Sequence, residues 1–133
     1  MSREKLLIEI SEALAEFQPA LHIIDQSNPI KIEGQFSIRH DEREIDSYVI
    51  RLNVTSNFPS IEPTVFEIGG RIPKTNDRHI NPNGSCCITI MEYWLATNKD
   101  QSFRAFLNGP MRDFFLGQFL FEKEEKWPFG EWS

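Results

Sequence analysis

The chain has 133 residues, of which 40% are hydrophobic and 26% charged, and its formal net charge at pH 7 is −6. This length suits one domain, residues 1–133, that can bury a core without disulfides or a structural metal. The negative charge, without any Lys/Arg cluster, argues against nucleic acid as a partner. No apolar run approaches the ~20 residues of a membrane span, and the charged N-terminus does not suit a signal peptide. We therefore expect a cytoplasmic protein without membrane contact.

The first predicted element is an amphipathic helix near the N-terminus. Its apolar stripe consists of Leu6, Leu7, Ile10, Leu14 and Phe17. Glutamates occupy most of the opposite side, as in a helix that covers a core with one face. Ser2 is placed to cap the first turn, and Pro19 stops the helix soon after its last apolar position.

Three predicted strands follow, each with the period-2 alternation of a half-buried strand. They are residues 30–38, 48–55 and 64–68. The charged segment His40–Glu44 connects the first two strands, and Pro59 and Pro63 bracket the bridge to the third. Short connections predict an antiparallel meander of three to four strands, with the N-terminal helix on its apolar face. The predicted fold class is therefore α+β.

Residues 71–89 show little periodicity, and we expect a long ordered loop or a short extended stretch there. After residue 94 the chain is predicted to be helical again. A brief helix at 103–107 is expected to end near Asn108-Gly109, and Pro110 is well placed to open another helix.

Aromatic residues gather toward the C-terminus. The helix after residue 110 is apolar nearly all round, so it must be buried on more than one side or meet a partner. Its phenylalanines are Phe114, Phe115, Phe119 and Phe121. We expect this helix to supply core, with a binding face as the alternative. Trp127, Phe129 and Trp132 are expected to hold the helix against the body, with partner docking as the alternative.

The predicted loop contains the run His79 to Ile88, which holds both cysteines of the chain and one of its three histidines. Asn81-Pro82-Asn83-Gly84 in the middle of the run is a strong turn signal, with Gly84 free to take a positive φ. A histidine before such a turn and a thiol after it can meet in space, as base or stabiliser and nucleophile. The run therefore predicts a catalytic site.

The two cysteines, Cys86 and Cys87, are adjacent, and no third cysteine can pair with either. We expect reduced thiols, and the spacing does not suit a zinc site, so neither a metal nor a cofactor is expected. Side chains of adjacent extended residues point in opposite directions. Cys87 is the candidate nucleophile, with a buried structural thiol as its alternative, and Cys86 is the candidate packing residue.

His79 is the candidate that takes a proton from an attacking amine or stabilises an oxyanion. The alternative is that it only satisfies backbone groups of the loop. Asp77 is a supporting candidate that could orient His79, with a solvated loop residue as its alternative. Asn81 is a second supporting candidate. The remaining histidines, His22 and His40, are expected to be surface or core residues.

The order of these features resembles the ubiquitin-conjugating enzyme family over about residues 3–97. Phe58-Pro59-Ser60-Ile61-Glu62-Pro63 matches the aromatic-Pro-x-x-x-Pro segment that the family has between strands. Asn83-Gly84-Ser85-Cys86-Cys87 matches its Asn-Gly-x-x-Cys element, whose thiol accepts ubiquitin. The resemblance implies that Cys87 is the acyl acceptor, while Cys86 stands where the family usually has an aliphatic residue.

One departure concerns the family's His-Pro-Asn element, where this chain has Asp77-Arg78-His79. His79 thus stands at the position of an Asn that steadies the oxyanion or the nearby backbone. Bacterial relatives are similar in placing a His there, particularly those encoded in CBASS-type antiphage operons beside a cyclic-oligonucleotide synthase. The short length and the Trp-Pro-Phe-Gly-Glu ending also resemble those proteins.

The resemblance implies an enzyme that forms a Cys87 thioester with a protein C-terminus and transfers it to a lysine or another nucleophile. The acyl donor would be the cyclic-oligonucleotide synthase, whose C-terminus behaves like that of ubiquitin. The chain has no phosphate-binding glycine motif, so activation with ATP would fall to a separate adenylating enzyme. The alternatives are a catalytically inactive binding module of the same fold and a cysteine isopeptidase or thioesterase, which would need a third, orienting residue.

Overall fold

The structure of the chain is a computed structural model that describes residues 2–124. Its first helix, α1 (Arg3–Phe17), begins and ends as the sequence predicts. The Ser2 hydroxyl accepts a hydrogen bond from the Lys5 backbone N–H at 3.2 Å and so caps the first turn. The buried residues of α1 are Leu6, Ile10, Ala13 and Leu14.

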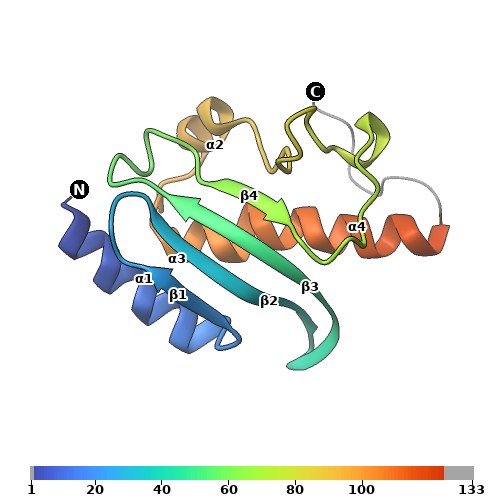
Figure 1. Cartoon of the computed structure of the whole chain (residues 1–133), viewed down its shortest axis with the longest axis horizontal. Coiled ribbons are helices and arrows are strands. Elements are labelled where there is room, and N and C mark those ends of the chain that lie inside the picture. The colour runs from blue at the N-terminus through green and yellow to red at the C-terminus, as the bar shows by residue number, and fades with distance from the viewer. Residues whose placement is uncertain (1, 125–133) are drawn as a thin grey trace.

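Four antiparallel strands form one sheet in the order β1-β2-β3-β4 (Figure 1). They are β1 (Leu21–Asp25), β2 (Ile30–His40), β3 (Arg43–Val54) and β4 (Thr64–Glu67). The predicted α+β class, with an N-terminal helix followed by an antiparallel meander, is confirmed. The pattern did not predict β1 as a separate strand, because five residues give too short an alternation to recognise.

The hairpin between β2 and β3 is tighter than predicted. We expected His40–Glu44 to be a connection, but both strands continue into it and only Asp41 and Glu42 form the turn. Both residues have positive φ, 51° and 64°, as in a type I′ turn. The charged side chains indicated a loop because an exposed hairpin end and a loop have the same polar composition.

One continuous helix runs from Phe103 to Glu124, where we predicted two. It consists of α3 (Phe103–Phe106), a π-helical segment (Leu107–Met111) and α4 (Arg112–Glu124). The predicted break at Asn108-Gly109 is therefore wrong, and Pro110 lies inside the helix. A proline has no backbone N–H to donate, and the wider π turn accommodates it without ending the helix.

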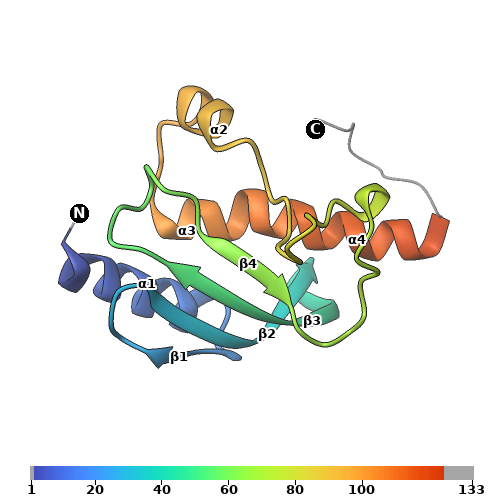
Figure 2. The same cartoon turned by 45° about the horizontal axis from the view of Figure 1, so that its top comes forward.

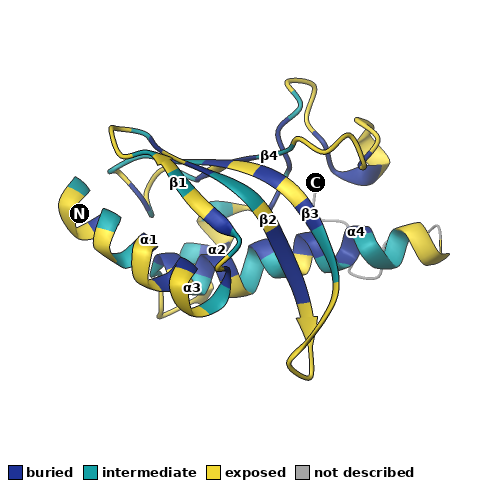
Figure 3. Cartoon of the chain, turned by 60° about the horizontal axis from the view of Figure 1, so that its bottom comes forward, coloured by how far each residue is buried: buried dark blue, intermediate teal, exposed yellow. Residues whose placement is uncertain are grey.

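Helices α1, α3 and α4 pack on the same face of the sheet (Figures 1 and 3). β2 and β3 bury alternate residues on this face, as predicted: Ile30, Ile32, Phe36, Ile38, Tyr48, Ile50, Leu52 and Val54. Phe115 of α4 packs against two rings of the sheet. Its ring centroid lies 5.2 Å from that of Phe36 and 5.3 Å from that of Tyr48.

The prediction that the aromatic helix supplies core is confirmed. Its phenylalanines Phe114 and Phe115 are fully buried, as are Phe103 and Phe106 of the preceding α3. Phe119 and Phe121 are half-buried. The roles predicted for Trp127, Phe129 and Trp132 lie outside the described residues.

A long loop, residues 68–90, connects β4 with α2 (Met91–Thr97) and passes beside α4 (Figure 2). It contains the 3-10 helix η1 (Asn76–Arg78) and the His/Cys run. The prediction of an ordered loop here is confirmed, and the sheet on one side and α4 on the other hold it in place.

Candidate functional site

The predicted turn lies in the middle of this loop. Asn81 N–H donates to the Ser85 carbonyl and Gly84 N–H donates to the Asn81 carbonyl, both at 2.8 Å. Gly84 has a φ of 91°, as predicted. The Asn83 side-chain oxygen accepts from the N–H and the hydroxyl of Ser85 at 3.0 and 2.7 Å. The turn therefore brings the two flanks of the run together through local hydrogen bonds.

His79 and Cys87 are paired across this turn. The Cys87 N–H donates to the His79 carbonyl at 2.9 Å, and the neighbouring residues Ile80 and Cys86 form an antiparallel bridge. The Cys86 N–H donates to the carbonyl of Val65 in β4 at 2.7 Å, which joins the loop to the sheet. The turn thus brings the backbones of His79 and Cys87 together, and the meeting of the imidazole and the thiol stays a prediction.

The two thiols have different surroundings. Cys86 is 5% exposed, and burial raises its pKa to about 12. This residue is a core thiol, as predicted. Cys87 is only half-buried, and its pKa is raised first by burial and then by the carboxylate of Glu62. Of the two, Cys87 is the thiol that a reaction partner can reach.

Glu62 is a residue of the site that the sequence reasoning missed. It lies in the Phe-Pro-x-x-x-Pro bridge, half-buried and directly before the buried Pro63. Burial raises the pKa of its carboxyl group, and its charge raises the pKa of Cys87. Its only sequence signal is an acidic side chain between two prolines, which says nothing about its distance from a thiol in another part of the chain.

His79 ends η1 in the left-handed region, with φ 58° and ψ 42°. This conformation costs a non-glycine residue ~1–2 kcal/mol, and a hydrogen bond from its N–H to the Asn76 carbonyl at 3.0 Å supports it here. His79 is 4% exposed. At this exposure an amine that arrives from solvent has little direct access to the imidazole ring.

The supporting candidates have different positions. Asp77 is exposed on η1, and its carboxylate takes no part in the side-chain hydrogen bonds and ion pairs found within residues 2–124. Asn81 is exposed in the turn, and its side-chain amide donates to the Ser85 hydroxyl at 3.0 Å. Asn81 therefore holds the turn. His22 and His40 are exposed on β1 and β2.

Arg78, which the sequence reasoning did not single out, joins the loop to α4. It is 7% exposed and directly precedes His79. Its Nε donates to the side-chain oxygen of Gln118 at 2.7 Å, and its carbonyl accepts from the Gln118 amide at 2.6 Å. A basic residue in a loop is usually solvated, so nothing in the sequence indicates this contact.

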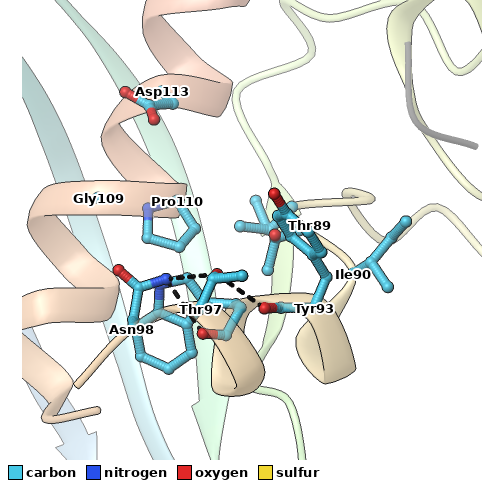
Figure 4. Close-up of a pocket in the computed structure, with 10 residues that line it drawn as sticks. Thr89, Ile90, Tyr93, Thr97, Asn98, Gly109, Pro110 and Asp113 are labelled. Carbon is cyan, nitrogen blue, oxygen red and sulfur yellow. Dashed lines mark hydrogen bonds between the residues drawn. The ribbon is translucent and has the colours of Figure 1, made fainter. Parts of the chain in front are cut away.

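A groove of about 660 Å³ includes Ile88, the residue that follows Cys87 in the chain, in its lining. Figure 4 shows Gly109, Pro110 and Asp113 on one side of it and residues of the α2 region on the other. The Asn98 side-chain amide donates to the Trp94 carbonyl at 3.0 Å and fixes the end of α2. Most of the lining is apolar or small: Ile88, Thr89, Ile90, Tyr93, Trp94, Thr97, Gly109 and Pro110.

Within the described part of the chain, no group of three or more His, Cys, Asp or Glu side chains could hold a metal ion. No helix in residues 2–124 combines the length and the apolar character needed to cross a bilayer. No protein-family model matches the chain, and no curated protein shows significant sequence similarity to it.

Proposed function

We propose that the chain is a ubiquitin-conjugating-like enzyme, in which Cys87 accepts the acyl group of a protein C-terminus as a thioester and passes it to a lysine or another nucleophile. The observation that carries this proposal is the contrast between the two thiols. Cys86 is buried and bonded to β4, whereas Cys87 is half-buried at the end of a turn that fixes its backbone. A carrier thiol needs both access to its partners and a fixed position.

The proposed reaction has two steps at the same carbonyl carbon. In loading, the Cys87 thiolate attacks the activated carboxyl group of the donor, a C–S bond forms and the donor's leaving group departs. In transfer, an amine attacks the thioester and forms the new C–N bond, the C–S bond breaks, Cys87 leaves as a thiolate, and the proton lost by the amine passes to solvent. Both steps pass through a tetrahedral oxyanion, so a hydrogen-bond donor near Cys87 accelerates them.

The raised pKa of Cys87 affects both steps. At neutral pH the neutral thiol dominates, so only a small fraction of the protein holds the nucleophilic thiolate. The same surroundings make Cys87 a poorer leaving group than an ordinary thiol. The loaded thioester should therefore be protected against adventitious attack until the acceptor amine is in place.

The partners follow from the resemblance carried by Phe58–Pro63 and Asn83–Cys87. We infer a cyclic-oligonucleotide synthase with a ubiquitin-like C-terminus as the acyl donor, and a separate adenylating enzyme that activates it. The reaction then belongs to bacterial antiphage defence in the cytoplasm. The groove supports a role with an extended peptide, because its lining is mostly apolar and includes Ile88, the residue that follows Cys87 in the chain.

A peptide thioester tests the loading step without the activating enzyme. The full chain is mixed with a short peptide that ends in a glycyl mercaptoethanesulfonate thioester, and intact mass measures the adduct. We expect an adduct on the parent chain and on Cys86→Ala that excess thiol removes. Cys87→Ser should form no thioester.

Three other outcomes of this measurement would each contradict a different part of the proposal. Equal loss of the adduct in both cysteine variants would contradict the assignment of Cys87. Steady release of free peptide acid would favour a thioesterase, and a chain that never forms an adduct would favour a binding module.

Discharge of the purified thioester to free lysine tests His79. His79→Ala should slow this step by ~10²–10³-fold, the usual scale for loss of one oxyanion donor, while the thioester still forms. His79→Asn should recover part of the rate if the residue supports the oxyanion. Normal discharge by the Ala variant would leave His79 as a residue that only structures the loop.

A further inference from the structure

Gln118 is a fully buried side chain of α4 that bonds to the loop. Its amide nitrogen donates to the Arg78 carbonyl at 2.6 Å, and its side-chain oxygen accepts from Arg78 Nε at 2.7 Å. Loss of either bond would leave a buried polar group without its partner, which destabilises the fold. A glutamine on a largely apolar helix is thus used for one specific contact.

Few links separate Gln118 from the candidate nucleophile. Gln118 holds the carbonyl of Arg78, and the next carbonyl along the chain, that of His79, accepts the Cys87 N–H at 2.9 Å. The two carbonyls belong to rigid peptide units that are joined at the Cα of His79, whose φ of 58° and ψ of 42° set the orientation of one unit relative to the other. α4 therefore sets the position of the Cys87 backbone through these contacts.

The Arg78 side chain is fixed from other directions as well. Its guanidinium lies over the Phe121 ring, 4.7 Å from the centroid, and its Nη2 is 3.7 Å from Glu122 Oε1. Glu122 in turn pairs with Arg71 at 2.8 Å. Within this network, Gln118 is the α4 side chain whose hydrogen bond reaches the backbone next to His79.

We propose that Gln118 is a positioning residue, which holds Cys87 in the half-buried place beside Glu62 where acyl transfer occurs. The proposal rests on Cys87 being the acyl acceptor, as proposed above. Gln118 acts through Arg78 and His79 and does not itself touch the reacting atoms.

The chain offers a matched control for the substitution Gln118→Met. Gln18 is 6% exposed and makes the same kind of paired contact, with the backbone of Ser37 in β2, at 2.8 and 3.0 Å. Gln118→Met and Gln18→Met each remove one buried amide and keep a similar volume. Both should lower the melting temperature by comparable amounts, but only the first should alter Cys87.

The first measurement is the pH profile of Cys87 alkylation by iodoacetamide, with Cys86→Ala present in every protein. Gln118→Met should release Cys87 from its half-buried place beside Glu62. The alkylation profile of this variant should therefore move to lower pH, and its alkylation rate at neutral pH should rise several-fold. Gln18→Met should follow the parent profile. This measurement needs no acyl transfer.

The second measurement is the discharge of the loaded thioester to lysine. Gln118→Met should lower the rate at saturating lysine by up to ~10²-fold, the loss expected from a misplacement of about 1 Å. The lysine concentration for half-maximal rate should stay unchanged, and Gln18→Met should match the parent in both values.

If no chain forms a thioester, the proposed function fails, and the alkylation profiles alone then decide for or against Gln118. Parent-like alkylation and discharge in Gln118→Met would overturn the proposal. If this variant does not unfold cooperatively, Gln118→Glu provides the same comparison, because it keeps the acceptor for Arg78 and lacks the donor to its carbonyl.

Discussion

Burial and one carboxylate determine the reactivity of Cys87. The half-buried position of the thiol raises its pKa, and the nearby Glu62 raises it further. Because Glu62 is itself half-buried, its charge is less screened than that of a solvated side chain. The bridge with its two prolines therefore acts on the chemistry of the site as well as on the path of the chain.

Glu62→Gln should make Cys87 more reactive. Loss of the negative charge lowers the pKa of the thiol, so at pH 7.5 more thiolate is present, and alkylation by iodoacetamide should accelerate by about 2–5-fold. Glu12→Gln, on the exposed face of α1, makes the same change in net charge and should leave the rate unaltered. Equal rates in the parent and in Glu62→Gln would show that burial alone sets the pKa.

Cys86 should make stability depend on pH in the alkaline range. Its pKa in the folded protein is about 12, against about 8.5 in an unfolded chain. Burial favours the neutral thiol, so the contribution to stability is complete below pH 8.5. It falls by about 1.4 kcal/mol per pH unit as the pH rises from there toward 12.

Urea denaturation at pH 7, 9 and 10 checks this prediction. The parent should lose more stability than Cys86→Ala between pH 7 and 10, although the variant is less stable at pH 7. Tyrosine and lysine titrate in both proteins, so the difference between the two curves isolates Cys86. Parallel curves would mean that Cys86 is not buried in its neutral form.

The continuous helix from α3 to α4 shows where local signals lead to a wrong prediction. Asn108-Gly109-Pro110 has the composition of a helix end and a new start, yet it lies in a π-helical segment. Packing outweighs this local preference, because Leu107 and Met111 on the same segment are fully buried. The sequence alone cannot weigh core contacts against a single proline.

Gly109→Ala should stabilise the protein. A Cβ at this position would meet nothing within 4 Å, and the backbone there is not in the left-handed region. Alanine restricts the unfolded chain and favours the helix, so we expect a gain of about 0.4–1 kcal/mol, visible as a higher melting temperature.

Gly34→Ala is the matched substitution, for which we expect the opposite change in stability. Gly34 has a φ of 144°, and its Cβ would collide with the backbone carbonyl of Ala20. This variant should be destabilised in the same thermal melts. A loss of stability in Gly109→Ala would mean that the π-helical segment requires the flexibility of glycine.

Across the chain, the features predicted from the sequence are those with a local cause. Ser2 and Pro19 mark the ends of α1, alternation marks the strands of the meander, and Asn-Pro-Asn-Gly marks the turn between His79 and Cys87. Glu62 and Gln118 were missed because their importance lies in contacts with residues distant in sequence. One sequence records residue types at such positions and not their neighbours in space.

The C-terminal helix should be indispensable to folding. Its Phe115 lies against Phe36 and Tyr48 of the sheet, so a chain that ends at Asn108 would expose that apolar layer. It would also lose Met111, Phe114 and Phe115, each fully buried. A fully buried phenylalanine is worth about 3–5 kcal/mol when truncated, so these losses together are as large as the ~5–15 kcal/mol stability of a whole domain.

Residues 1–108 alone should therefore be insoluble or molten, with secondary structure in far-UV circular dichroism but no cooperative urea transition and strong binding of a hydrophobic dye. In the full chain, Phe115→Ala should unfold at markedly lower urea, which tests the same contacts without removing the helix. Removal of residues 127–133 should be milder, a lower melting temperature or lost partner binding. A 1–108 chain that melts cooperatively would show that the sheet and α1 form a domain by themselves. The aromatic helix would then be a docking element, and the binding-module alternative would gain weight over the conjugating enzyme.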